Sequence, residues 1–425
     1  MKKTSVFMCA TIFWEALFLF AGCKVPSYPN SDSSSAFTDY EYKEVQAVNA
    51  VVPADFMRGF DASMVSYLEE NGAVYYDKQN QSCDPLAALK ECGVNWVRLR
   101  LWHTPDSSSC GDNDLARTLK AAVRAKALGL KVLLDFHYSD TWADPGNQTA
   151  PNAWKNISSV QKMAAAVKEY TASVLNDFSE KNALPDMVQI GNEIESGILL
   201  KNVISGMEGT AGTQNFTDYL SAAAESVRAC APDAKIMLHM SRGGNSRVLK
   251  KFLQNTDGID FDAVGFSYYP FFKSHGTLEE LKSNIQTVVN AGKECAVVET
   301  SFAWSIWTEG KSDSTNDQLW YYDSNGNGLC QAAKSLIDSD SKVLAELDVI
   351  NYEGTDCIEP SVKNQTNVIR AIIEAAASAG ATGVFYWGGD WVTAASVGSP
   401  MENQALFDFE HKILPGAMAF GVQGN

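Results

Sequence analysis

Two glutamates stand at the ends of short apolar runs, where an acidic side chain can be presented to a substrate. Glu193 is the last residue of the run 187–193, and Glu299 ends the apolar part of the run 296–300. Two carboxyl groups that face each other across a cleft can hydrolyse a glycosidic bond, because one protonates the leaving oxygen while the other attacks the sugar carbon. A single glutamate at a strand end is more often a cap or an ion-pair partner. Two of them, with Asn192 before the first, indicate a catalytic pair.

Polar residues alternate with apolar ones along two earlier runs. Arg98, Arg100 and Trp102 share one face of the first run, and Asp135 and His137 share one face of the second. Because buried charge is costly unless it is paired, Arg98 or Arg100 should pair with Asp135. A purely structural ion pair is an equally good interpretation of Arg98 with Asp135. The strand-end residues Arg100, Trp102 and His137 are better candidates for a functional site.

Aromatic residues follow the ends of many of these apolar runs. There are ten of them: Trp102, Tyr138, Trp142, Trp154, Tyr268, Tyr269, Trp304, Trp307, Trp387 and Trp391. The apolar face of an indole fits the C–H face of a pyranose ring, and the indole N–H can reach a hydroxyl. Any one aromatic residue is more often part of a core, but ten near loop starts favour a sugar-binding site, with Tyr268 among its candidate contacts.

Short apolar, β-branched runs recur after Pro53 and predict eight strands. They span residues 56–63, 94–103, 131–138, 187–193, 235–240, 263–269, 296–300 and 383–387. Amphipathic patterns between them predict helices over 114–128, 217–230, 246–254, 278–291 and 367–379. A capping box at Ser158–Gln161 predicts the start of a further helix. Gly129, Gly292 and Gly380 stand where the end of a helix favours glycine.

Strands that alternate with helices and are apolar on both faces indicate an α/β fold with a parallel sheet covered by helices. Eight strands is the number that closes a barrel. The pattern therefore predicts one (β/α)8 barrel (a TIM barrel), with the catalytic domain over residues 54–421. An open, doubly wound parallel sheet is the alternative.

The first residues form a separate segment. A basic start at Met1–Lys3, a largely apolar stretch over 4–20 and small residues before Cys23 are typical of an exported chain. Residues 1–22 resemble a bacterial lipoprotein signal, in which Cys23 becomes the lipidated first residue; plain secretion and a retained anchor are the alternatives. Residues 23–53 are rich in serine and predict a flexible tether. We expect contact with a membrane only through the anchor.

The composition argues against nucleic acid as a partner. Lys and Arg number 34 against 51 Asp and Glu, so the formal net charge is −17, and no basic run is longer than a pair. The cysteines after Cys23 have no short paired spacing, which argues against a zinc cluster. Cys83 with Cys110, or Cys330 with Cys357, are conceivable disulfides. We expect a monomer with no cofactor and no bound metal.

The chain resembles the arabinogalactan endo-β-1,4-galactanases, which form glycoside hydrolase family 53 and have a (β/α)8 fold. The most specific stretch is 134–148, which contains His-Tyr-Ser-Asp-Thr-Trp-Ala-Asp-Pro over residues 137–145. Further matching stretches are Gly59–Ser63, Asn95–Trp102, Gln189–Ile194, Val298–Thr300 and Glu402–Asp408. These stretches are spread along the chain, so the resemblance extends over nearly all of residues 55–410.

The resemblance implies a retaining endo-β-1,4-galactanase whose partner is the polysaccharide β-1,4-galactan. It implies that Glu193 is the acid/base, that Glu299 is the nucleophile and that Asn192 binds the sugar 2-hydroxyl. It also implies that other residues support the substrate site: Arg100, His137, Asp140, Trp142, Trp387 and Asn403.

The chain departs from the family pattern in two places. Family members usually have Trp-Glu-Pro after the last strand, whereas here Trp387 is followed by Gly-Gly-Asp, so a carboxylate is missing or displaced to Asp390. The segment 308–360 matches poorly. Within it, 323–328 resembles only the start of a calcium loop, which favours a solvated turn over a metal site.

Two other functions stay open on the sequence alone. The first is a hydrolase of the same clan that cleaves another β-glycan, such as mannan or glucan, because the acid pair is shared while the loops select the sugar. The second is a noncatalytic glycan-binding lipoprotein on the cell surface. The intact pair Glu193 and Glu299 argues against that second alternative.

Overall fold

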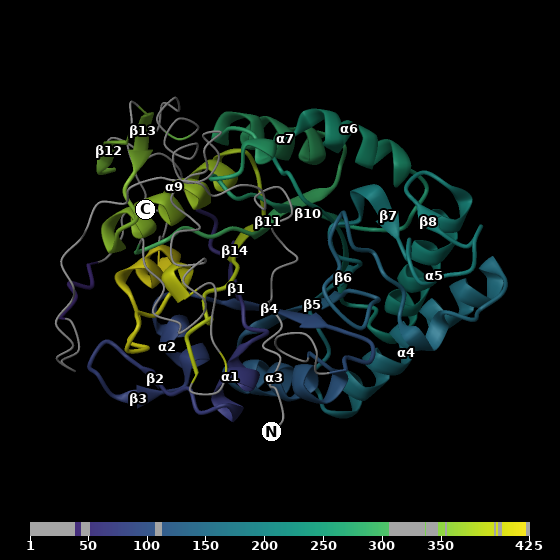
Figure 1. The fold of residues 1–425 in the computed structure, drawn as a ribbon, viewed down its shortest axis with the longest axis horizontal. Coiled ribbons are helices and arrows are strands. Elements are labelled where there is room, and N and C mark those ends of the chain that lie inside the picture. The colour runs from purple at the N-terminus through teal and green to yellow at the C-terminus, as the bar shows by residue number, and fades with distance from the viewer. Residues whose placement is uncertain are drawn as a thin grey trace, which may run out of the picture.

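The computed structural model describes residues 39–43, 52–106, 113–305, 336, 347–352, 355–394, 397 and 402–421 of the 425-residue chain. Eight parallel strands close a barrel, and helices surround it (Figure 1). In barrel order the strands are β1 (Met57–Asp61), β14 (Gly383–Tyr386), β11 (Glu294–Glu299), β10 (Ala263–Ser267), β9 (Lys235–Met240), β6 (Met187–Ile190), β5 (Lys131–Phe136) and β4 (Trp96–Leu101). Each coincides with one predicted run, so the closed barrel is confirmed and the open sheet is wrong.

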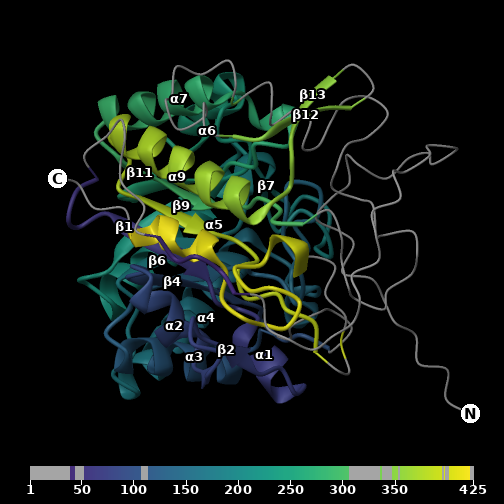
Figure 2. The ribbon, with the colours of Figure 1, turned by 90° about the vertical axis from the view of Figure 1, so that its left-hand side faces the viewer.

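The helices bury one apolar face each against the outside of the barrel. They are α1 (Val65–Glu70), α2 (Pro85–Glu91), α3 (Leu115–Ala127), α4 (Val160–Glu180), α5 (Gln214–Cys230), α6 (Ser246–Asn255), α7 (Leu278–Asn290) and α9 (Val362–Ser378). Figure 2 shows α6, α7 and α9 on one side of the strands and α2, α3 and α4 on the other. All five helices predicted from amphipathic patterns are therefore confirmed, with shifted ends.

Small elements in the loops complete the described chain. Three two-stranded antiparallel sheets pair β2 (Tyr75–Tyr76) with β3 (Ser82–Cys83), β7 (Gly197–Ile198) with β8 (Gly209–Thr210), and β12 (Val349–Tyr352) with β13 (Thr355–Ile358). Single turns of 3-10 helix are η1 (Asn152–Trp154), η2 (Ile194–Ser196), η3 (Lys273–His275) and η5 (Glu402–Gln404), and η6 (Pro415–Gly421) is longer.

The helix ends follow the predicted chemistry with one exception. The N-cap of α4 is Ser159, whose hydroxyl accepts the Lys162 N–H at 3.2 Å, so the capping box predicted at Ser158–Gln161 is wrong by one residue. A capping box does open α7, where Thr277 and Glu280 exchange hydrogen bonds of 3.1 and 2.8 Å. The glycines predicted to end helices have positive φ: Gly129 (73°), Gly292 (78°) and Gly380 (90°).

The barrel interior has two layers of different chemistry. The layer nearer the amino ends of the strands is apolar. It comprises Met57, Trp96, Leu133, Met187, Met237, Ala263, Ala296, Val298 and Phe385. Trp96 and Phe385 meet edge to face there, with ring centroids 6.2 Å apart. One step further along the same strands the inward residues are polar, and they include Arg98, Asp135 and Gln189. The charged layer therefore begins directly beyond the apolar layer, nearer the carboxyl ends of the strands.

Part of the predicted tether contacts the barrel domain. The Tyr40 hydroxyl donates to Asp408 at 3.0 Å, and the Tyr42 hydroxyl donates to a backbone carbonyl near the C-terminus at 2.5 Å. The predicted signal segment 1–22 and Cys23 lie outside the described residues. In the part of the chain that the structure covers, no helix has the length and apolar character needed to cross a membrane.

The cysteines divide into free thiols and one disulfide-bonded residue. Cys83, Cys92, Cys230 and Cys295 are free, so the conceivable pair of Cys83 with Cys110 is wrong. Cys357 is disulfide-bonded, which agrees with its expected participation in a bridge. Cys110, Cys330 and the run 323–328 lie outside the described residues.

The apolar layer predicts a large cost for truncation. Leu133→Ala should lower the free energy of unfolding by about 2–5 kcal/mol, because the closed layer cannot collapse into the cavity that is left. The control Val123→Ala, at a position on α3 that is 40% exposed, should change it by less than about 0.5 kcal/mol. Urea denaturation of both variants measures the difference. Equal effects would contradict a closed apolar layer.

Candidate active site

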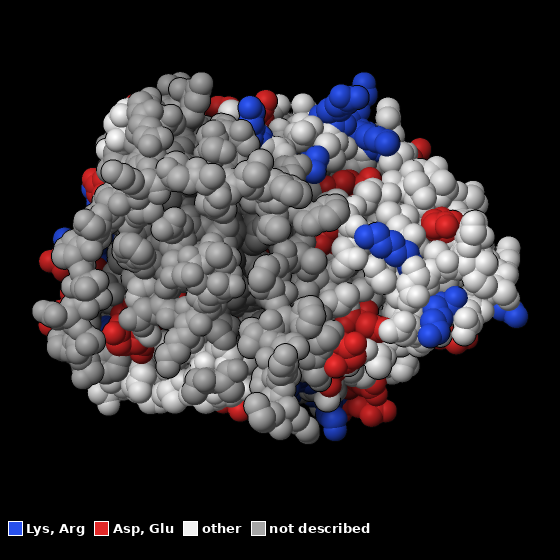
Figure 3. All heavy atoms as spheres, in the orientation of Figure 1, with Lys and Arg blue, Asp and Glu red and all other residues white. Residues whose placement is uncertain are grey.

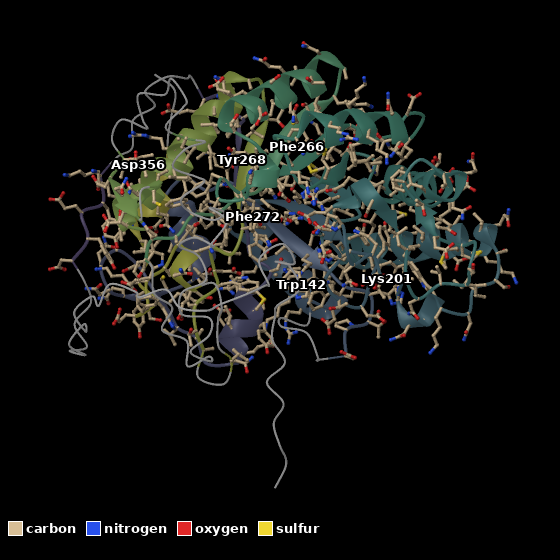
Figure 4. The ribbon with its side chains drawn as sticks, turned by 45° about the horizontal axis from the view of Figure 1, so that its top comes forward. Trp142, Lys201, Phe266, Tyr268, Phe272 and Asp356 are labelled. Atoms are coloured by element: carbon tan, nitrogen blue, oxygen red, sulfur yellow. The ribbon has the colours of Figure 1, made fainter. Side chains whose placement is uncertain are left out.

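A cavity of about 300 Å³ opens at the carboxyl ends of the barrel strands. Its walls come from strand ends and from the loops after β5, β6, β9 and β10. The lining residues are Arg98, Arg100, His137, Trp142, Ala143, Asp144, Pro145, Gly146, Asn192, Glu193, Ser241, Arg242, Tyr269, Phe272, Ser274, His275, Glu299 and Trp387. Figure 4 labels Trp142 and Phe272, which reach the cavity from the loops after β5 and β10. This is the end of the barrel where (β/α)8 enzymes carry their active sites.

The two predicted glutamates face each other in this cavity. A carboxylate oxygen of Glu193 and one of Glu299 lie within 4.8 Å of each other. The Ser267 hydroxyl stands between them, 2.7 Å from Glu193 Oε1 and 3.2 Å from Glu299 Oε2. A retaining glycosidase needs its carboxyl groups about 5–5.5 Å apart, whereas an inverting enzyme needs about 6.5–9.5 Å to admit a water molecule. The separation here suits the retaining geometry.

Glu299 is held by a buried guanidinium and a phenol. Arg98 Nη1 donates to Glu299 Oε1 at 2.8 Å, and the Tyr269 hydroxyl donates to Oε2 at 3.0 Å. The Arg98 side chain is 1% exposed and also forms an ion pair of 2.8 Å with Asp135. The predicted pairing of Arg98 with Asp135 is therefore confirmed. Arg98 is a structural ion-pair partner, and it also lines the cavity.

The inward direction of Glu299 depends on an irregular strand register. Ala296 and Val298 belong to the inner apolar layer, so regular alternation would turn Glu299 toward the helices. The register between β10 and β11 shifts between Phe266 and Ser267, which pairs Ser267 with Glu299. A bulge of this kind re-aims a side chain, and here it places consecutive residues of β11 on the interior face.

Glu193 is presented by a strained turn after β6. Its backbone has φ 50° and ψ 58°, a left-handed conformation that is rare outside glycine. Gly191 precedes it with φ 93°, and a Cβ at that position would lie 2.6 Å from a side-chain carbon of Ile194. The Glu193 N–H donates to His239 Nδ1 at 3.3 Å. The turn thus lifts the carboxyl group into the cavity while His239 fixes its backbone.

The two carboxyl groups have different surroundings, which favour a proton on Glu193 over a proton on Glu299. Burial raises the pKa of Glu193 well above its usual value, and the neighbouring charges of Glu299 and Glu195 raise it further. Burial also raises the pKa of Glu299, but there the Arg98 guanidinium opposes the rise. Two like charges this close cannot both ionise easily, so Glu193 holds the proton and Glu299 carries the charge.

One wall of the cavity is built from planar groups that contact one another. The Arg100 guanidinium carbon lies 3.8 Å from the centroid of the Trp142 ring, and Trp387 meets Trp142 at 6.2 Å. His137 Nδ1 accepts the Trp102 N–H at 3.3 Å and the Ala143 N–H at 3.1 Å. Its other nitrogen therefore carries the proton and donates to Asp135 at 3.1 Å. This wall offers a flat aromatic surface beside polar groups.

The structure brings together most of the residues predicted for the site, and three lie elsewhere. Asp140 accepts the backbone N–H groups of Thr104 and Asn152 and so joins two loops outside the cavity wall. Tyr268 is fully buried on the face opposite Ser267 and Tyr269. Its hydroxyl has no partner among the described residues. Asn403 donates to the Ser305 carbonyl at 3.1 Å and supports a loop.

Asp390 does not replace the family carboxylate in the cavity. Its side chain is fully buried and accepts the Met64 N–H at 3.0 Å, and it is absent from the cavity wall. Burial and the nearby charge of Asp61 raise the pKa of Asp390 well above its usual value. Burial thus disfavours the charged form of this carboxyl group, and its hydrogen bond to the backbone is structural.

Sequence reasoning missed the small and neutral members of the site. Ser267 and His239 carry no charge at neutral pH, and burial lowers the pKa of His239 well below its usual value. His239 Nε2 lies 3.0 Å from the Ser267 hydroxyl. Strand alternation would have favoured Tyr269 over Tyr268 as a site residue. Tyr269 is two residues from Ser267 and therefore lies on the same face, whereas Tyr268 lies on the opposite face. Ser267 itself had no signal until the shifted register was known.

Among the described residues, Glu193, His239 and Glu299 are the one group close enough to hold a metal ion, with ligand atoms within 4.8 Å of one another. Both nitrogens of His239 already have hydrogen-bond partners, since Nδ1 accepts the Glu193 N–H at 3.3 Å and Nε2 lies 3.0 Å from the Ser267 hydroxyl. Arg98 already neutralises Glu299. The donor set therefore fits an acid pair better than a metal centre.

A (β/α)8 barrel with a close carboxyl pair and an aromatic wall at the carboxyl ends of its strands defines a glycoside hydrolase. The profile of Glycosyl hydrolase family 53 matches residues 57–355 and 339–420, and the chain belongs to that family.

Named relatives and a solved structure share this family likeness. The Endo-beta-1,4-galactanase of Bacillus subtilis is 29% identical over 99% of this chain and 97% of its own length. The Arabinogalactan endo-beta-1,4-galactanase of Cellvibrio japonicus is 30% identical over 86% of this chain and 90% of its own. The solved GH53 catalytic domain of Ignisphaera aggregans superposes with a TM-score of 0.71 at 34% identity, covering 89% of this chain and all (100%) of that domain.

The buried charge cluster predicts a pH-dependent loss of stability when its cation is removed. Arg98→Met should lower the free energy of unfolding by about 3–5 kcal/mol at neutral pH, because Asp61, Asp135 and Glu299 would then lack a compensating charge. Arg117→Met removes a half-exposed ion pair with Glu70 and should cost about 1 kcal/mol or less. Urea denaturation at pH 7 and pH 4 measures both.

The difference between Arg98→Met and wild type should shrink at pH 4. Burial alone would raise the pKa of Asp135, but Arg98 and His137 hold it below its usual value. That contribution to wild-type stability is present above the unfolded pKa of about 3.9 and is lost as the pH falls through the folded pKa. In the variant the carboxyl groups take up protons at higher pH, which relieves their repulsion. A difference that grows toward pH 4 would contradict this account.

Proposed function

We propose that the protein is a retaining endo-β-1,4-galactanase that hydrolyses internal bonds of galactan. The observation that carries the retaining mechanism is the close approach of Glu193 and Glu299, within 4.8 Å across the Ser267 hydroxyl. Membership of glycosyl hydrolase family 53 and the galactanase names of relatives from Bacillus subtilis and Cellvibrio japonicus support the choice of substrate.

In this mechanism Glu299 is the nucleophile and Glu193 the acid/base. Glu299 attacks the anomeric carbon while Glu193 gives its proton to the leaving glycosidic oxygen, which forms a glycosyl–enzyme ester and releases one end of the chain. Glu193, now ionised, takes a proton from water, and the water oxygen breaks the ester at the anomeric carbon. The β configuration is retained because two inversions occur.

The charges of the site assist these steps. Arg98 and Tyr269 contact Glu299 and hold it ionised and oriented for attack. Asn192 Oδ1 accepts from Arg98 at 2.8 Å, and its amide nitrogen donates to Ala143 at 2.8 Å, which fixes it beside the carboxyl pair. We propose that Asn192 binds the sugar 2-hydroxyl from this position.

The remaining cavity residues are proposed to bind the sugar rings. Trp142 and Trp387 bring aromatic rings to the cavity, and Arg100 and His137 are polar lining residues beside them. The alternative of another β-glycan uses the same acid pair, so substrate choice rests on these walls. Asp140, Tyr268 and Asn403 would act indirectly, by supporting loops and packing.

We further propose that the protein is exported and that Cys23 is a lipid anchor. The basic, then apolar, then small-residue pattern before Cys23 supports this. A polymeric substrate too large to enter a cell also favours an exported enzyme. A monomer suffices for the proposed chemistry, since every group named in it comes from one chain.

The substrate proposal predicts selective cleavage of galactan. Purified protein should release reducing ends from linear β-1,4-galactan, with internal cleavage seen as a rapid fall in chain length, and should leave cellulose and β-mannan intact. A buried protein group that forms a hydrogen bond with the axial 4-oxygen of galactose loses that bond when the sugar carries an equatorial 4-oxygen, as glucose and mannose do. Each group left without a partner costs about 1–3 kcal/mol. Comparable rates on galactan and mannan would instead favour a broader β-glycanase.

The assignment of roles predicts different behaviour for the two acids. Glu299→Ala should lose turnover by several orders of magnitude, and added azide should restore cleavage with an α-glycosyl azide as product. Glu193→Ala should lose about 10²–10⁴-fold on galactan but little on aryl galactosides, because a good leaving group needs no proton. Glu225→Ala, at an exposed acid of α5, is the control and should match wild type. Equal loss on both substrates for Glu193→Ala would refute its acid role.

A further inference from the structure

An exposed basic surface lies on the helix that follows a cavity-lining loop in the chain, although the chain as a whole carries a net charge of −17. This surface, here called the basic ridge, consists of Arg247, Lys250 and Lys251 on α6, all exposed. Residues 247, 250 and 251 have i, i+3 and i+4 spacing, so their side chains share one face of the helix. Figure 3 shows the corresponding blue side chains gathered over α6.

The ridge has no acidic residues of its own to neutralise it. Neither α6 nor the turn between Ser241 and its start contains Asp or Glu, and the three cations form no ion pair among the described residues. The nearest acids in the sequence lie beyond these limits: Asp257 follows the helix, while Glu279 on α7 is paired with Lys282 at 3.1 Å. Like charges at this spacing disfavour the helix, so the ridge is not explained by stability.

The ridge follows closely in the chain after residues that line the cavity. Ser241 and Arg242 line the cavity at the end of β9, and α6 begins at Ser246 only four residues later. The Gly244 N–H donates to the carbonyl of His275, another lining residue, at 2.8 Å. Lys273, exposed and flanked by the lining residues Phe272 and Ser274, adds a further cation on the same side.

The charge of the ridge limits what it can attract. A neutral glycan gains nothing from such a positive field, whereas a polymer with carboxylate groups would be attracted by it.

We propose that the basic ridge binds a carboxylate-bearing stretch of polysaccharide to which the neutral galactan substrate is covalently attached. This inference rests on the proposed function, since it concerns the polymer that presents the galactan. A glycan occupant is favoured because the chain that leads into α6 lines the proposed glycan cavity at Ser241 and Arg242. A membrane is disfavoured because none of the exposed large hydrophobic residues lies on α6 or on the adjoining loops.

The test compares one neutral and one acidic substrate at low salt. Arg247→Ser, Lys250→Ser and Lys251→Ser are combined in one variant. The matched control combines Lys155→Ser, Lys162→Ser and Lys181→Ser, which remove the same charge from exposed positions near α4. The substrates are linear β-1,4-galactan and the same galactan attached to a polygalacturonate backbone. The rate on neutral galactan also reports whether each variant is folded.

The ridge variant should show an increase of about tenfold in KM on the acidic substrate, and 0.5 M NaCl should abolish the difference from wild type. Its kinetics on neutral galactan should equal those of wild type, and the control variant should behave as wild type on both. Unchanged kinetics of the ridge variant on the acidic substrate would overturn the inference while leaving the galactanase proposal intact. Failure of wild type on neutral galactan would instead overturn the proposed function.

A second arm separates a polysaccharide from a lipid surface. Wild type should bind polygalacturonate in affinity electrophoresis, and the ridge variant should lose that retardation. Binding to vesicles with 30% phosphatidylglycerol should be equal for the ridge and control variants. Loss of vesicle binding in the ridge variant, with polygalacturonate binding unchanged, would overturn the inference in favour of a membrane contact.

Discussion

The buried guanidinium of Arg98 is the interaction on which both the barrel interior and the site depend. It lies 2.8 Å from Asp135 and from Glu299 and 3.4 Å from Asp61, and it also donates to Asn192 at 2.8 Å. A cation this deeply buried is tolerated only because its partners satisfy it, and the carboxylates in turn need the cation. The group that balances charge inside the barrel is therefore the same group that orients Glu299. A substitution of Arg98 would therefore change both the stability of the barrel interior and the geometry of the acid pair.

Regular strand geometry alone would not have assembled this site. Alternation along β11 would have turned Glu299 to the helices, and a regular exit from β6 would have left Glu193 outside the left-handed region. The register shift beside Ser267 and the backbone of Glu193 at φ 50° correct both. Such irregularities persist only where the surroundings over-determine them, and here Arg98 and His239 supply those contacts. The closeness of the two carboxyl groups follows from two local departures from ideal geometry.

Most of the fold was predictable because it depends on patterns of short range. Eight apolar runs, five amphipathic helices and the glycines that end helices all follow from the alternation of residue types. The pairing of Arg98 with Asp135 was predictable for the same reason, since both lie on the inward face. The preference for Tyr268 over Tyr269 failed at the strand end, where neighbouring residues differ only in the face they occupy. Asp140 and Asn403 face loop backbones, and loop paths are not encoded in periodicity.

The departure at the last strand shows how a lost family carboxylate changes the charge of the site. Trp387 keeps its place in the wall, and the chain turns at Gly388, with φ 75°, so that the buried Asp390 accepts the Met64 N–H instead of lining the cavity. Burial raises the pKa of Asp390 and so disfavours a further negative charge beside the barrel interior. Asp390 is also not among the groups that shift the pKa of Glu193: burial and the charges of Glu299, Glu195 and Asp144 raise that pKa, and the hydrogen bond from Ser267 opposes the rise.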